Sequence, residues 1–536
     1  MNKKIVIFII LLLGLIGSYR LFRPGYFSMQ DDMHVFRLQQ FNKCISELQI
    51  PCRLIPDGGM GYGYPLFNFY SPASYALAEI FHLIGFSFIN SIKIIFTATS
   101  FLRPLGMFLL SSLFFGPIGG LISAILFALA PYQAVNSFVR GAIAENFAIS
   151  LIPFVLWFLL KQRYFLFSLC LCLLALSHNL TLLYTLPIVL IFSFLTPKNS
   201  KKTIIHSILG LGMACFFLLP AFFEKQLTTV NTMTEGYFNF VNHFTTLKQL
   251  FINRNDWGYG ASLWGPVDDM SFQVGYLQWI FPIITVFLII KSKIKNRNFF
   301  ILLFLLGIFS LFLTHNKSTF IWQLIPFLPF YQFPWRFLAP AIFFFSFISG
   351  FLGQQTISKK NKILLLFLLL SIELILSFSF FKEDIWYPAL TDHEKLSGEN
   401  LIAQSNAGLK DYWPKYGLNF PLSFAPSAPQ VLSGNATVFS FSKTSRSTTS
   451  IISVRSESAF VTLPIVYFPN YKVSINDNSS SYLIDRNLGL INLELPFGEN
   501  NIKIIFYNTP IRTLSNLISI FSLLGLGLLY LYKHES

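Results

Sequence analysis

The sequence predicts an all-α polytopic membrane protein of about twelve transmembrane helices, with a β-sandwich domain outside the membrane near the C-terminus. Three observations lead to this prediction. The 536 residues are 54% hydrophobic and only 12% charged, whereas soluble domains carry roughly 25% charged residues. Apolar runs long enough to cross a bilayer recur along the chain. Residues 382–510 then change character and become polar, rich in Ser and Asn, with alternating apolar positions.

The predicted spans follow one another with short connections. The N-terminal run MNKKIVIFIILLLGLIG lacks an A-x-A-like cleavage site, so it is predicted to be an uncleaved first span. Further apolar runs predict spans at about 91–113, 117–135, 142–160, 164–177, 180–196, 203–222, 273–291, 298–314, 336–353, 361–381 and 514–532. The stretch 73–87 is predicted to be an interfacial helix, because a full span there would move every later basic cluster to the outside.

The basic residues lie in short clusters beside the spans. A formal net charge of +15 suggests nucleic acid as a partner, but the clusters form no broad basic face, so nucleic-acid binding is not expected. All clusters fall on the side of Lys3, as the positive-inside rule requires: Lys161 with Arg163, Lys198 to Lys202, 291–297, 358–362 and Lys533. We therefore expect a multi-pass protein of the inner (cytoplasmic) membrane with both termini in the cytoplasm.

The chain is expected to have three parts. Residues 1–381 form the transmembrane domain, which includes a large outer loop at 23–90. Residues 382–510 form the extracytoplasmic β-sandwich, because runs such as TSIISVRS, AFVTLPIVYF and GLINLEL alternate between Gly/Asn/Asp turns. Residues 511–536 form the last transmembrane helix and a short cytoplasmic tail. Cys44 and Cys52 share the outer loop, where an oxidising compartment would permit a disulfide.

Candidate catalytic residues follow the first span directly, in FSMQDDMHVFRLQQF at 27–41. Asp31 and Asp32 are adjacent carboxylates, and His34 comes two residues later. Neighbouring like charges disfavour double ionisation, which suits one of them to act as a general base near neutral pH. The alternative is that an Asp caps the short amphipathic helix that follows.

The segment PDGGMGYGYPLFNFYSP at 56–72 is dense in Gly and aromatic residues. It matches neither G-x-G-x-x-G nor a Walker-type phosphate loop. Its glycines permit tight turns and close approach of backbone to a ligand. Tyr62, Tyr64 and Tyr70 offer flat faces to a sugar ring, with hydroxyls at the water boundary. The alternative is an aromatic belt that anchors the loop among lipid headgroups.

Four more candidates stand at outer ends of predicted spans. Arg140 and Glu145 either pair with each other, or Arg140 holds a donor phosphate while Glu145 lies beside the Asp pair. Arg336 is either a phosphate ligand, whose guanidinium snorkels to the surface while its fork meets phosphate oxygens, or an interfacial anchor. His178 either caps a helix, or it joins His34 and Asp31 at a metal site, since imidazole and carboxylate suit several divalent ions.

Two charged residues, Arg103 and Glu373, stand in the middle of predicted spans. A charge at the bilayer centre costs about 2.5–3.5 kcal/mol on insertion scales. We therefore expect both side chains to face the interior of the helix bundle.

Several motifs together carry a family resemblance: DDMHVFRLQQF, LIPDGGMGYGYPLFNFYSP, FVRGAIAEN, LSHNLTLLY and QFPWRFL, in this order. They resemble prokaryotic polytopic proteins described as 6-pyruvoyl-tetrahydropterin synthase-related membrane proteins, which are similar to the GT-C superfamily of glycosyltransferases. The late YFPNYKV and PFGENNIKIIFY resemble the β-sandwich of such proteins. The likeness covers almost the whole chain and implies a GT-C-like transmembrane domain.

The resemblance also implies a reaction. GT-C enzymes have an acidic residue in the first extracytoplasmic loop, the place of Asp31 and Asp32 here. They transfer a sugar from a polyprenyl-phosphate carrier outside the cytoplasm. The expected partners are thus a polyprenyl-phosphate sugar donor, a glycan, lipid or protein acceptor of the cell envelope, and membrane lipids. A divalent metal ion stays open as a cofactor.

The alternative function is a transporter or flippase of lipid-linked glycans. A transporter is expected to place polar residues and broken helices near the midplane, within repeated halves. Most candidate polar residues of this chain instead gather at the predicted outer face, which favours a glycosyltransferase.

Overall fold

The computed structural model describes residues 3–195, 199–252, 258–263, 270–292, 294, 296–354 and 359–535. The basic residues Lys198, Lys293 and Lys295 lie outside these ranges. The chain divides into two compact units. The unit that we call the helical unit consists of Met1–Asp32, Ile89–Leu211 and Met233–Leu390. The other, the sheet unit, consists of Met33–Phe88, Gly212–Thr232 and Thr391–Ser536.

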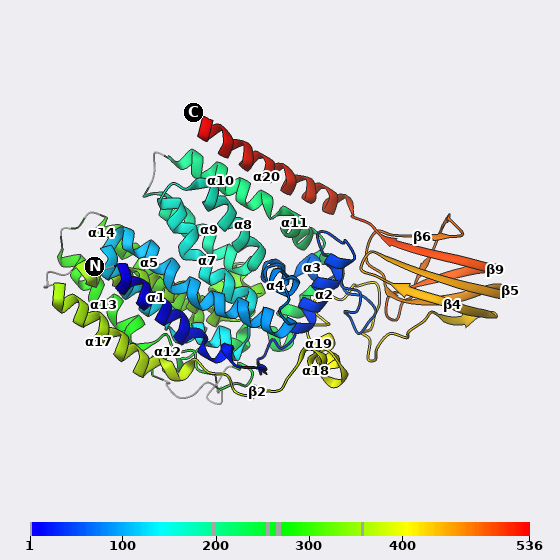
Figure 1. Cartoon of the computed structure of the whole chain (residues 1–536), viewed down its shortest axis with the longest axis horizontal. Coiled ribbons are helices and arrows are strands. Elements are labelled where there is room, and N and C mark those ends of the chain that lie inside the picture. Colours follow the sequence, from blue (N-terminus) through cyan, green and yellow to red (C-terminus); the bar gives the residue numbers. More distant parts are fainter. Residues whose placement is uncertain are drawn as a thin grey trace. The chain divides into compact units, whose positions relative to one another are not determined.

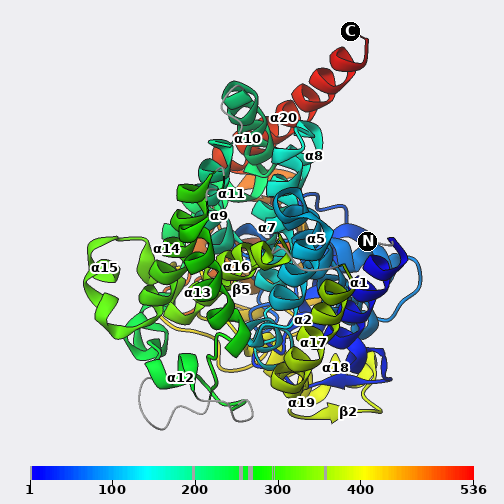
Figure 2. The ribbon, with the colours of Figure 1, turned by 90° about the vertical axis from the view of Figure 1, so that its left-hand side faces the viewer.

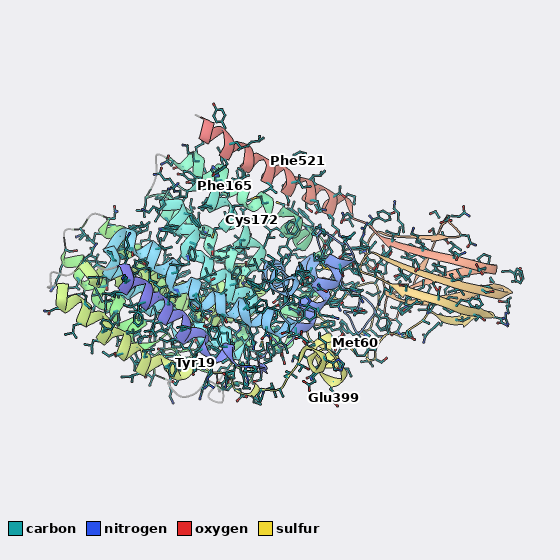
Figure 3. All side chains as sticks on the ribbon, in the orientation of Figure 1. Tyr19, Met60, Phe165, Cys172, Glu399 and Phe521 are labelled. Atoms are coloured by element: carbon teal, nitrogen blue, oxygen red, sulfur yellow. A yellow bond between two sulfur atoms is a disulfide. The ribbon has the colours of Figure 1, made fainter. Side chains whose placement is uncertain are left out.

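The helical unit contains most of the long apolar helices (Figures 1 and 2). Its α-helices are α1 (Lys3–Ser18), α5 (Phe88–Ala128), α6 (Pro131–Ala134), α7 (Ile143–Leu160), α8 (Tyr164–Ser177), α9 (Asn179–Ser193), α10 (Ser200–Met213), α12 (Leu247–Phe251), α13 (Tyr276–Lys291), α14 (Arg297–Thr314), α15 (Thr319–Leu324), α16 (Leu338–Ser349) and α17 (Lys359–Ser377). Side chains fill the spaces between them (Figure 3), and α16 is buried along its whole length.

Seven helices among the described residues are long and apolar enough to cross a membrane. They are Lys3–Phe22, Phe88–Ala128, Ile143–Leu160, Arg297–Thr314, Pro334–Gln354, Ile363–Phe380 and Pro510–Tyr532. The bent pair α10 and α11 (Cys215–Phe223) gives eight if it counts as one span. Three further apolar helices, α8, α9 and α13, are shorter. These helices indicate a membrane protein, as predicted, whereas the count of about twelve spans is not confirmed.

Part of the difference in count comes from α5. The sequence predicted two spans, at 91–113 and 117–135, and both fall largely within this one element of 41 residues. Gly116 interrupts the helix with φ 68° and ψ 179°, and Pro117 follows it. Proline removes a backbone hydrogen bond inside a helix and favours a break, so two helical segments meet at this residue without a loop between them.

The sheet unit combines several short helices and the long helix α20 with one antiparallel sheet. Its α-helices are α2 (His34–Ser46), α3 (Leu66–Phe69), α4 (Ala73–Leu83), α11, α18 (Asp392–Lys395), α19 (Gly398–Asn406) and α20 (Pro510–Glu535). Its strands are β3 (Gln430–Ser433), β4 (Ala436–Lys443), β5 (Ser447–Val466), β6 (Tyr471–Ile475), β7 (Asn478–Ser480), β8 (Leu483–Ile484) and β9 (Leu490–Phe506). The predicted helix at 73–87 is present as the shorter α4.

The long strands β5 and β9 form the centre of the sheet (Figure 1). β5 pairs with β3, β4 and β9, and β9 also pairs with β6 and β8. The register of the β5–β9 pair shifts between Val454 and Ser458, which marks a bulge or irregularity. The strands predicted within 382–510 are therefore confirmed as an antiparallel sheet. All seven described strands of this region belong to one hydrogen-bonded sheet, so the finer description as two packed sheets stays a prediction.

The core of the sheet unit follows from the alternation that the sequence shows. Ile452, Val461, Leu493 and Ile504 point to one side of their strands and are fully or almost fully buried. Burial of each such side chain contributes about 1.5–3 kcal/mol. The apolar positions of β5 and β9 thus hold the sheet together, while most of their polar neighbours are at least partly accessible.

A disulfide joins Cys44, on α2, to Cys52. We expect the double substitution Cys44→Ser with Cys52→Ser to lower the free energy of unfolding, because the cross-link restricts the unfolded chain. With a sequence separation of 8 residues, the chain-entropy relation gives about 2–3 kcal/mol. Thermal unfolding in detergent measures the effect, with Cys172→Ser on α8 as the control. Equal unfolding midpoints for the double variant and the control would contradict it.

Candidate functional site

Backbone hydrogen bonds fix Asp31 beside Arg140 in the helical unit. The segment starts at strand β1 (Tyr26–Phe27), which pairs with β2 (Trp386–Tyr387). The Gln30 amide then donates to the Val139 carbonyl over 2.9 Å, and the Asp31 amide donates to the Arg140 carbonyl over 2.8 Å. Asp31 is half-buried. The first acidic residue after the first span is therefore held next to a predicted phosphate ligand.

Trp386 on β2 keeps the chain before Asp31 in place. Its indole Nε1 donates to the Pro24 carbonyl over 2.8 Å. The guanidinium of Arg23 lies over the indole ring, 4.0 Å from the ring centroid. Arg20 and Arg23 both pair with Glu383. Because the residues after α1 are tied to β2 in this way, the position of Asp31 does not depend on the first span alone.

Arg140 and Glu145 form a buried ion pair, one of the two alternatives that their sequence positions left open. Arg140 follows the π-helical segment Val135–Val139, and Glu145 stands in the first turn of α7. Arg140 Nη1 lies 2.8 Å from Glu145 Oε2 and also donates to Asn136 Oδ1. Tyr132 Oη donates to Glu145 Oε1 over 2.7 Å. Both oxygens of the carboxylate thus have a partner from the preceding residues.

Arg336 approaches the same carboxylate. It belongs to the 3₁₀ segment Pro334–Phe337, and its Nε lies 3.3 Å from Glu145 Oε2. Its Nη1 donates to the Tyr331 carbonyl over 2.8 Å. The Arg336 side chain is only 11% exposed. The predicted snorkelling of this guanidinium to the surface is therefore wrong, because aromatic packing, with the Phe333 ring centroid 5.0 Å away, covers it beside Glu145.

That aromatic packing comes from segments between the helices. Trp322 is fully buried, stacks on Phe240 at 5.2 Å and belongs to a cluster that includes Tyr331 and Phe337. Trp335 stacks on Phe272 at 5.2 Å and lies under the Arg140 guanidinium, 4.6 Å from it. A cation over an indole face is attracted to the ring. The aromatic residues that flank Arg336 in the sequence, such as Trp335 and Phe337, are thus packed, and Trp335 also positions the Arg140 guanidinium near Glu145.

The charges of this cluster are unequal. Two guanidiniums face the single carboxylate of Glu145, and Asp31 also acts on both of them. Burial alone would lower the pKa of Arg140, but the negative charges of Glu145 and Asp31 raise it above its usual value. Among the described residues, the guanidinium hydrogen bonds of Arg140 and Arg336 involve Nη1 of each, and Nε of Arg336 also faces Glu145. Each guanidinium therefore keeps N–H groups for a further acceptor, as an anion would provide.

His178 lies close enough to Glu145 for their charges to interact, and it caps α9. Its Nδ1 accepts from the Thr181 amide over 3.3 Å and lies 2.8 Å from Thr181 Oγ1. Burial lowers the pKa of His178 to about 3, and the positive charges of Arg336 and Arg140 act in the same direction against the opposing effect of Glu145. The imidazole is thus neutral near pH 7, with Nδ1 occupied by the cap, which was one of the two predicted alternatives.

We expect His178→Ala to lower the free energy of unfolding by about 0.5–2 kcal/mol, because α9 loses the acceptor at its N-cap. His178→Asn should retain most of the stability, since the Asn oxygen can accept from the Thr181 amide. Chemical or thermal unfolding of the two variants in detergent measures the difference. If the Ala variant is as stable as the Asn variant, capping is not a role of His178.

His34 lies in the sheet unit, at the start of α2. It is fully buried, and its Nδ1 lies 2.8 Å from Tyr75 Oη. The N-cap of α2 is Met33, which makes no side-chain cap hydrogen bond. The interpretation of Asp31 or Asp32 as the N-cap of this helix is therefore wrong. The burial of His34 gives no support to its predicted catalytic role.

The Gly- and Tyr-rich loop is closed by backbone pairing. Ile55 and Tyr64 exchange two hydrogen bonds of 2.8 and 3.0 Å. Gly59 turns the chain with φ +61°, and a Cβ there would come 2.8 Å from the Trp413 ring. Asp57 accepts from Lys43 and Gln40, and although burial alone would raise its pKa, these contacts lower it. The glycines thus permit the tight turns that the sequence predicted.

The tyrosines of this loop differ from their predicted role. Tyr62 and Tyr64 are 7% and 5% exposed, and Tyr64 Oη donates to the Gly408 carbonyl and accepts from the Tyr412 amide. Their rings are therefore not open faces for a sugar, and the prediction is corrected because tertiary packing within the sheet unit covers them. Tyr70 is half-buried, with the Arg37 guanidinium 4.3 Å from its ring centroid.

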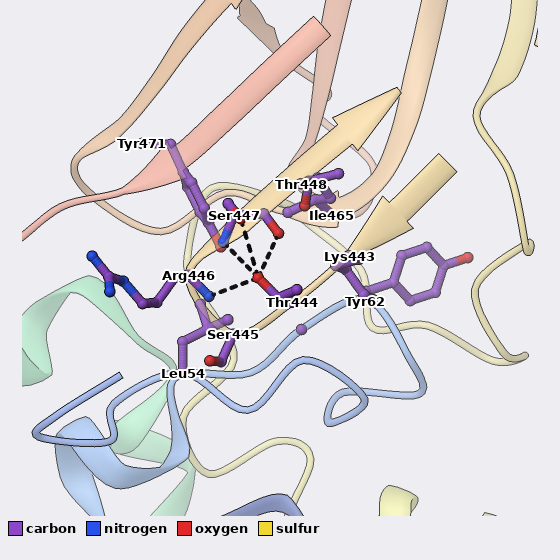
Figure 4. A pocket seen from close by; sticks show the side chains of 11 residues that line it. Leu54, Tyr62, Lys443, Thr444, Ser445, Arg446, Ser447, Thr448, Ile465 and Tyr471 are labelled. Carbon is purple, nitrogen blue, oxygen red and sulfur yellow. Dashed lines mark hydrogen bonds between the residues drawn. The ribbon is translucent and has the colours of Figure 1, made fainter. Parts of the chain in front are cut away.

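A small pocket of mixed polar and apolar lining in the sheet unit includes Tyr62 (Figure 4). It lies beside the turn that joins β4 to β5, where Thr444 Oγ1 accepts from the Ser447 amide over 3.0 Å. Lys443 donates to the Gly61 carbonyl, and burial lowers the pKa of this lysine to about 8. The bond from Lys443 attaches the glycine-rich loop to the sheet.

No group of three or more His, Cys, Asp or Glu side chains is placed to hold a metal ion within the described part of the chain. The predicted candidates Asp31, His34 and His178 do not form such a group. In comparisons with known proteins, no family model and no curated protein matches this chain.

The two charges predicted to face the bundle interior are buried there, but they do not pair with each other. Arg103 donates to Asn146 Oδ1 and Ser137 Oγ. Glu373 accepts from Gln278 and Ser377. Sequence reasoning missed the polar partners that satisfy these charges, and it missed Tyr132 and Trp335. Both aromatics lie at outer ends of predicted spans, which was the available signal.

Proposed function

We propose that the chain is a membrane glycosyltransferase of the GT-C type that transfers a sugar from a polyprenyl-phosphate-linked donor to an extracytoplasmic acceptor. The observation that carries the proposal is the juxtaposition of Asp31 with Arg140 and Arg336 in one unit. The backbone of Asp31, just past the first span, bonds to that of Arg140, and its negative charge acts on two guanidiniums that share the buried carboxylate of Glu145. These side chains suit a reaction at the end of a membrane span in which one substrate group loses a proton and another gains negative charge.

The chemistry assigns a role to each group. An acceptor hydroxyl loses its proton as the new glycosidic bond forms, and Asp31 is the carboxylate placed to accept it. The carrier phosphate gains negative charge as the sugar leaves. The remaining N–H groups of Arg140 and Arg336 are the donors for that charge, and fixed cations stabilise it without reorganisation. Glu145 and Trp335 hold the guanidiniums in place, and Asp32 is the second candidate base.

The proposal places the Asp31 end of the first span outside the cytoplasm, in an inner membrane with both termini inside. The Cys44–Cys52 disulfide supports this orientation, since disulfides persist in oxidising compartments. A cytoplasmic location of this loop is the competing possibility.

Cysteine labelling tests the orientation. In a chain whose free cysteines Cys170, Cys172 and Cys215 are replaced by Ala, we expect Thr437→Cys on β4 to react with a membrane-impermeant maleimide in intact cells. Lys161→Cys, which is exposed after α7, should react only after the cytoplasmic face is opened. The reverse pattern would overturn the orientation and, with it, the location proposed for the site.

Sugar transfer by the purified protein tests the function itself. In detergent there is no membrane gradient, so a transporter or flippase has no net movement to perform, whereas a glycosyltransferase retains its reaction. We expect release of polyprenyl phosphate from a panel of polyprenyl-phosphate sugars when an envelope-extract acceptor is present. Absence of release across the panel, together with donor movement across the bilayer in proteoliposomes, would favour the transporter.

A further inference from the structure

A buried carboxylic acid lies among the helices, apart from the residues of the proposed reaction. Glu373 on α17 is fully buried, and within the described residues it has no ion pair. Gln278 Nε2, from α13, donates to Glu373 Oε1 over 2.6 Å, and Ser377 Oγ donates to the same oxygen over 3.0 Å. One oxygen of the carboxyl group thus accepts two hydrogen bonds, as a carbonyl oxygen does.

The other oxygen has no partner. Glu373 Oε2 and Gln278 Oε1 are both buried, and neither has a hydrogen bond among the described residues. The second N–H of the Gln278 amide donates to the Leu126 carbonyl over 3.0 Å, so this nitrogen is fully used. If Glu373 is ionised, both atoms without a partner are acceptors and no donor satisfies either. An unsatisfied buried polar atom is costly, which makes this arrangement unfavourable.

A single proton resolves both deficits. Placed on Glu373 Oε2, it donates to Gln278 Oε1, while Gln278 Nε2 donates to Glu373 Oε1. With this proton each of the two unpartnered oxygens of the pair gains a hydrogen bond, so every polar atom of the acid and the amide has a partner. We propose that Glu373 and Gln278 form a proton-binding site in the interior of the helical unit, in which the carboxyl group is occupied by a proton at neutral pH.

The surroundings favour the neutral acid. Among the described residues, the side chains that donate to Glu373 are those of Gln278 and Ser377, and no cation forms an ion pair with it. An ionised carboxylate without a cation is strongly disfavoured inside a membrane-spanning bundle. Gly275 leaves room for the amide: its φ is +101°, and a Cβ there would lie 2.0 Å from Gln278 Oε1.

Infrared spectroscopy of the purified protein at neutral pH tests the site directly. A protonated carboxyl group has a C=O stretching band separate from that of a carboxylate, and the band shifts in D₂O. We expect this band in the wild type and its loss in Glu373→Gln. Glu383→Gln, which removes a carboxylate paired with Arg20 and Arg23, should leave the band unchanged. A spectrum in which Glu373→Gln removes carboxylate intensity instead would overturn the proposal.

Thermal unfolding gives a second readout that does not depend on sugar transfer. The Gln side chain can reproduce the protonated acid, since its N–H donates where the proton did and its oxygen accepts as before. We therefore expect Glu373→Gln to unfold near the wild-type temperature, and Glu373→Ala and Gly275→Ala to unfold earlier. Raising the pH should destabilise the wild type more than Glu373→Gln. Equal loss of stability in the Gln and Ala variants would refute the proton-binding site.

Discussion

Replacement of Asp31 by Asn is expected to abolish sugar transfer while the protein remains folded. A positioned general base contributes roughly 10²–10⁴-fold to such a step, and Asn cannot accept the proton of an acceptor hydroxyl. The backbone bond from the Asp31 amide to the Arg140 carbonyl does not involve the side chain and should persist. Release of polyprenyl phosphate, measured with thermal unfolding of the same preparation, gives both results.

Two comparison variants sharpen this expectation. Asp32→Asn tests the second candidate base, and we expect Asp31→Asn to have the larger effect because Asp31 acts electrostatically on both Arg140 and Arg336. Asp477→Asn, in the turn between β6 and β7, changes a carboxylate of the sheet unit and should transfer sugar like the wild type. Capping of α2 does not account for a loss of transfer, since its N-cap is Met33. Wild-type activity in both Asp31→Asn and Asp32→Asn would refute the catalytic loop.

Local patterns in the sequence predicted the local elements well. The apolar spacing after the Asp pair predicted a short amphipathic helix, which is α2, and Phe36 and Leu38 on it are buried. Alternation predicted strands within 382–510, where β5 and β9 occur. Both predictions rest on the spacing of apolar residues within one element, which differs between a helix and a strand and can be seen in the sequence of that element alone. The count of spans depends on how helices join, and the break at Gly116 without a loop gives no such periodic signal.

In the candidate site, too, features that depend on neighbouring residues in the sequence were predictable, and features that depend on tertiary packing were not. The residue types at Arg140 and Glu145 indicated a pair, because they stand close in sequence at one corner. The approach of Arg336 to Glu145 was not predictable from local pattern, since it depends on the packing of Trp335 and Phe272. The prediction of open sugar-binding faces was wrong for Tyr62 and Tyr64 for the same reason, because tertiary packing covers both rings. Aromatic residues suit both binding faces and cores, and only the bonds of Tyr64 to Gly408 and Tyr412 decide between them.

Arg336→Lys is expected to reduce sugar transfer by roughly 10²–10³-fold, the effect of losing one positioned donor at a developing charge. The Arg336 guanidinium contacts the Tyr331 carbonyl, Gln332 Oε1 and Glu145 at once. A lysine ammonium is a single point on a flexible stem, so it cannot keep this geometry and also present a donor to phosphate. The loss should appear mainly in kcat, because the charge on the phosphate grows in the transition state.

The lysine variant separates this role from a purely structural one. Lysine retains the positive charge beside Glu145, so the carboxylate is not left buried without a cation, a defect that costs about 3–5 kcal/mol. Folding should therefore change less than transfer does. Arg455→Lys, at an exposed position on β5, controls for the loss of any guanidinium. A well-folded Arg336→Lys protein with full kcat would remove Arg336 from the phosphate site and leave it a structural partner of Glu145.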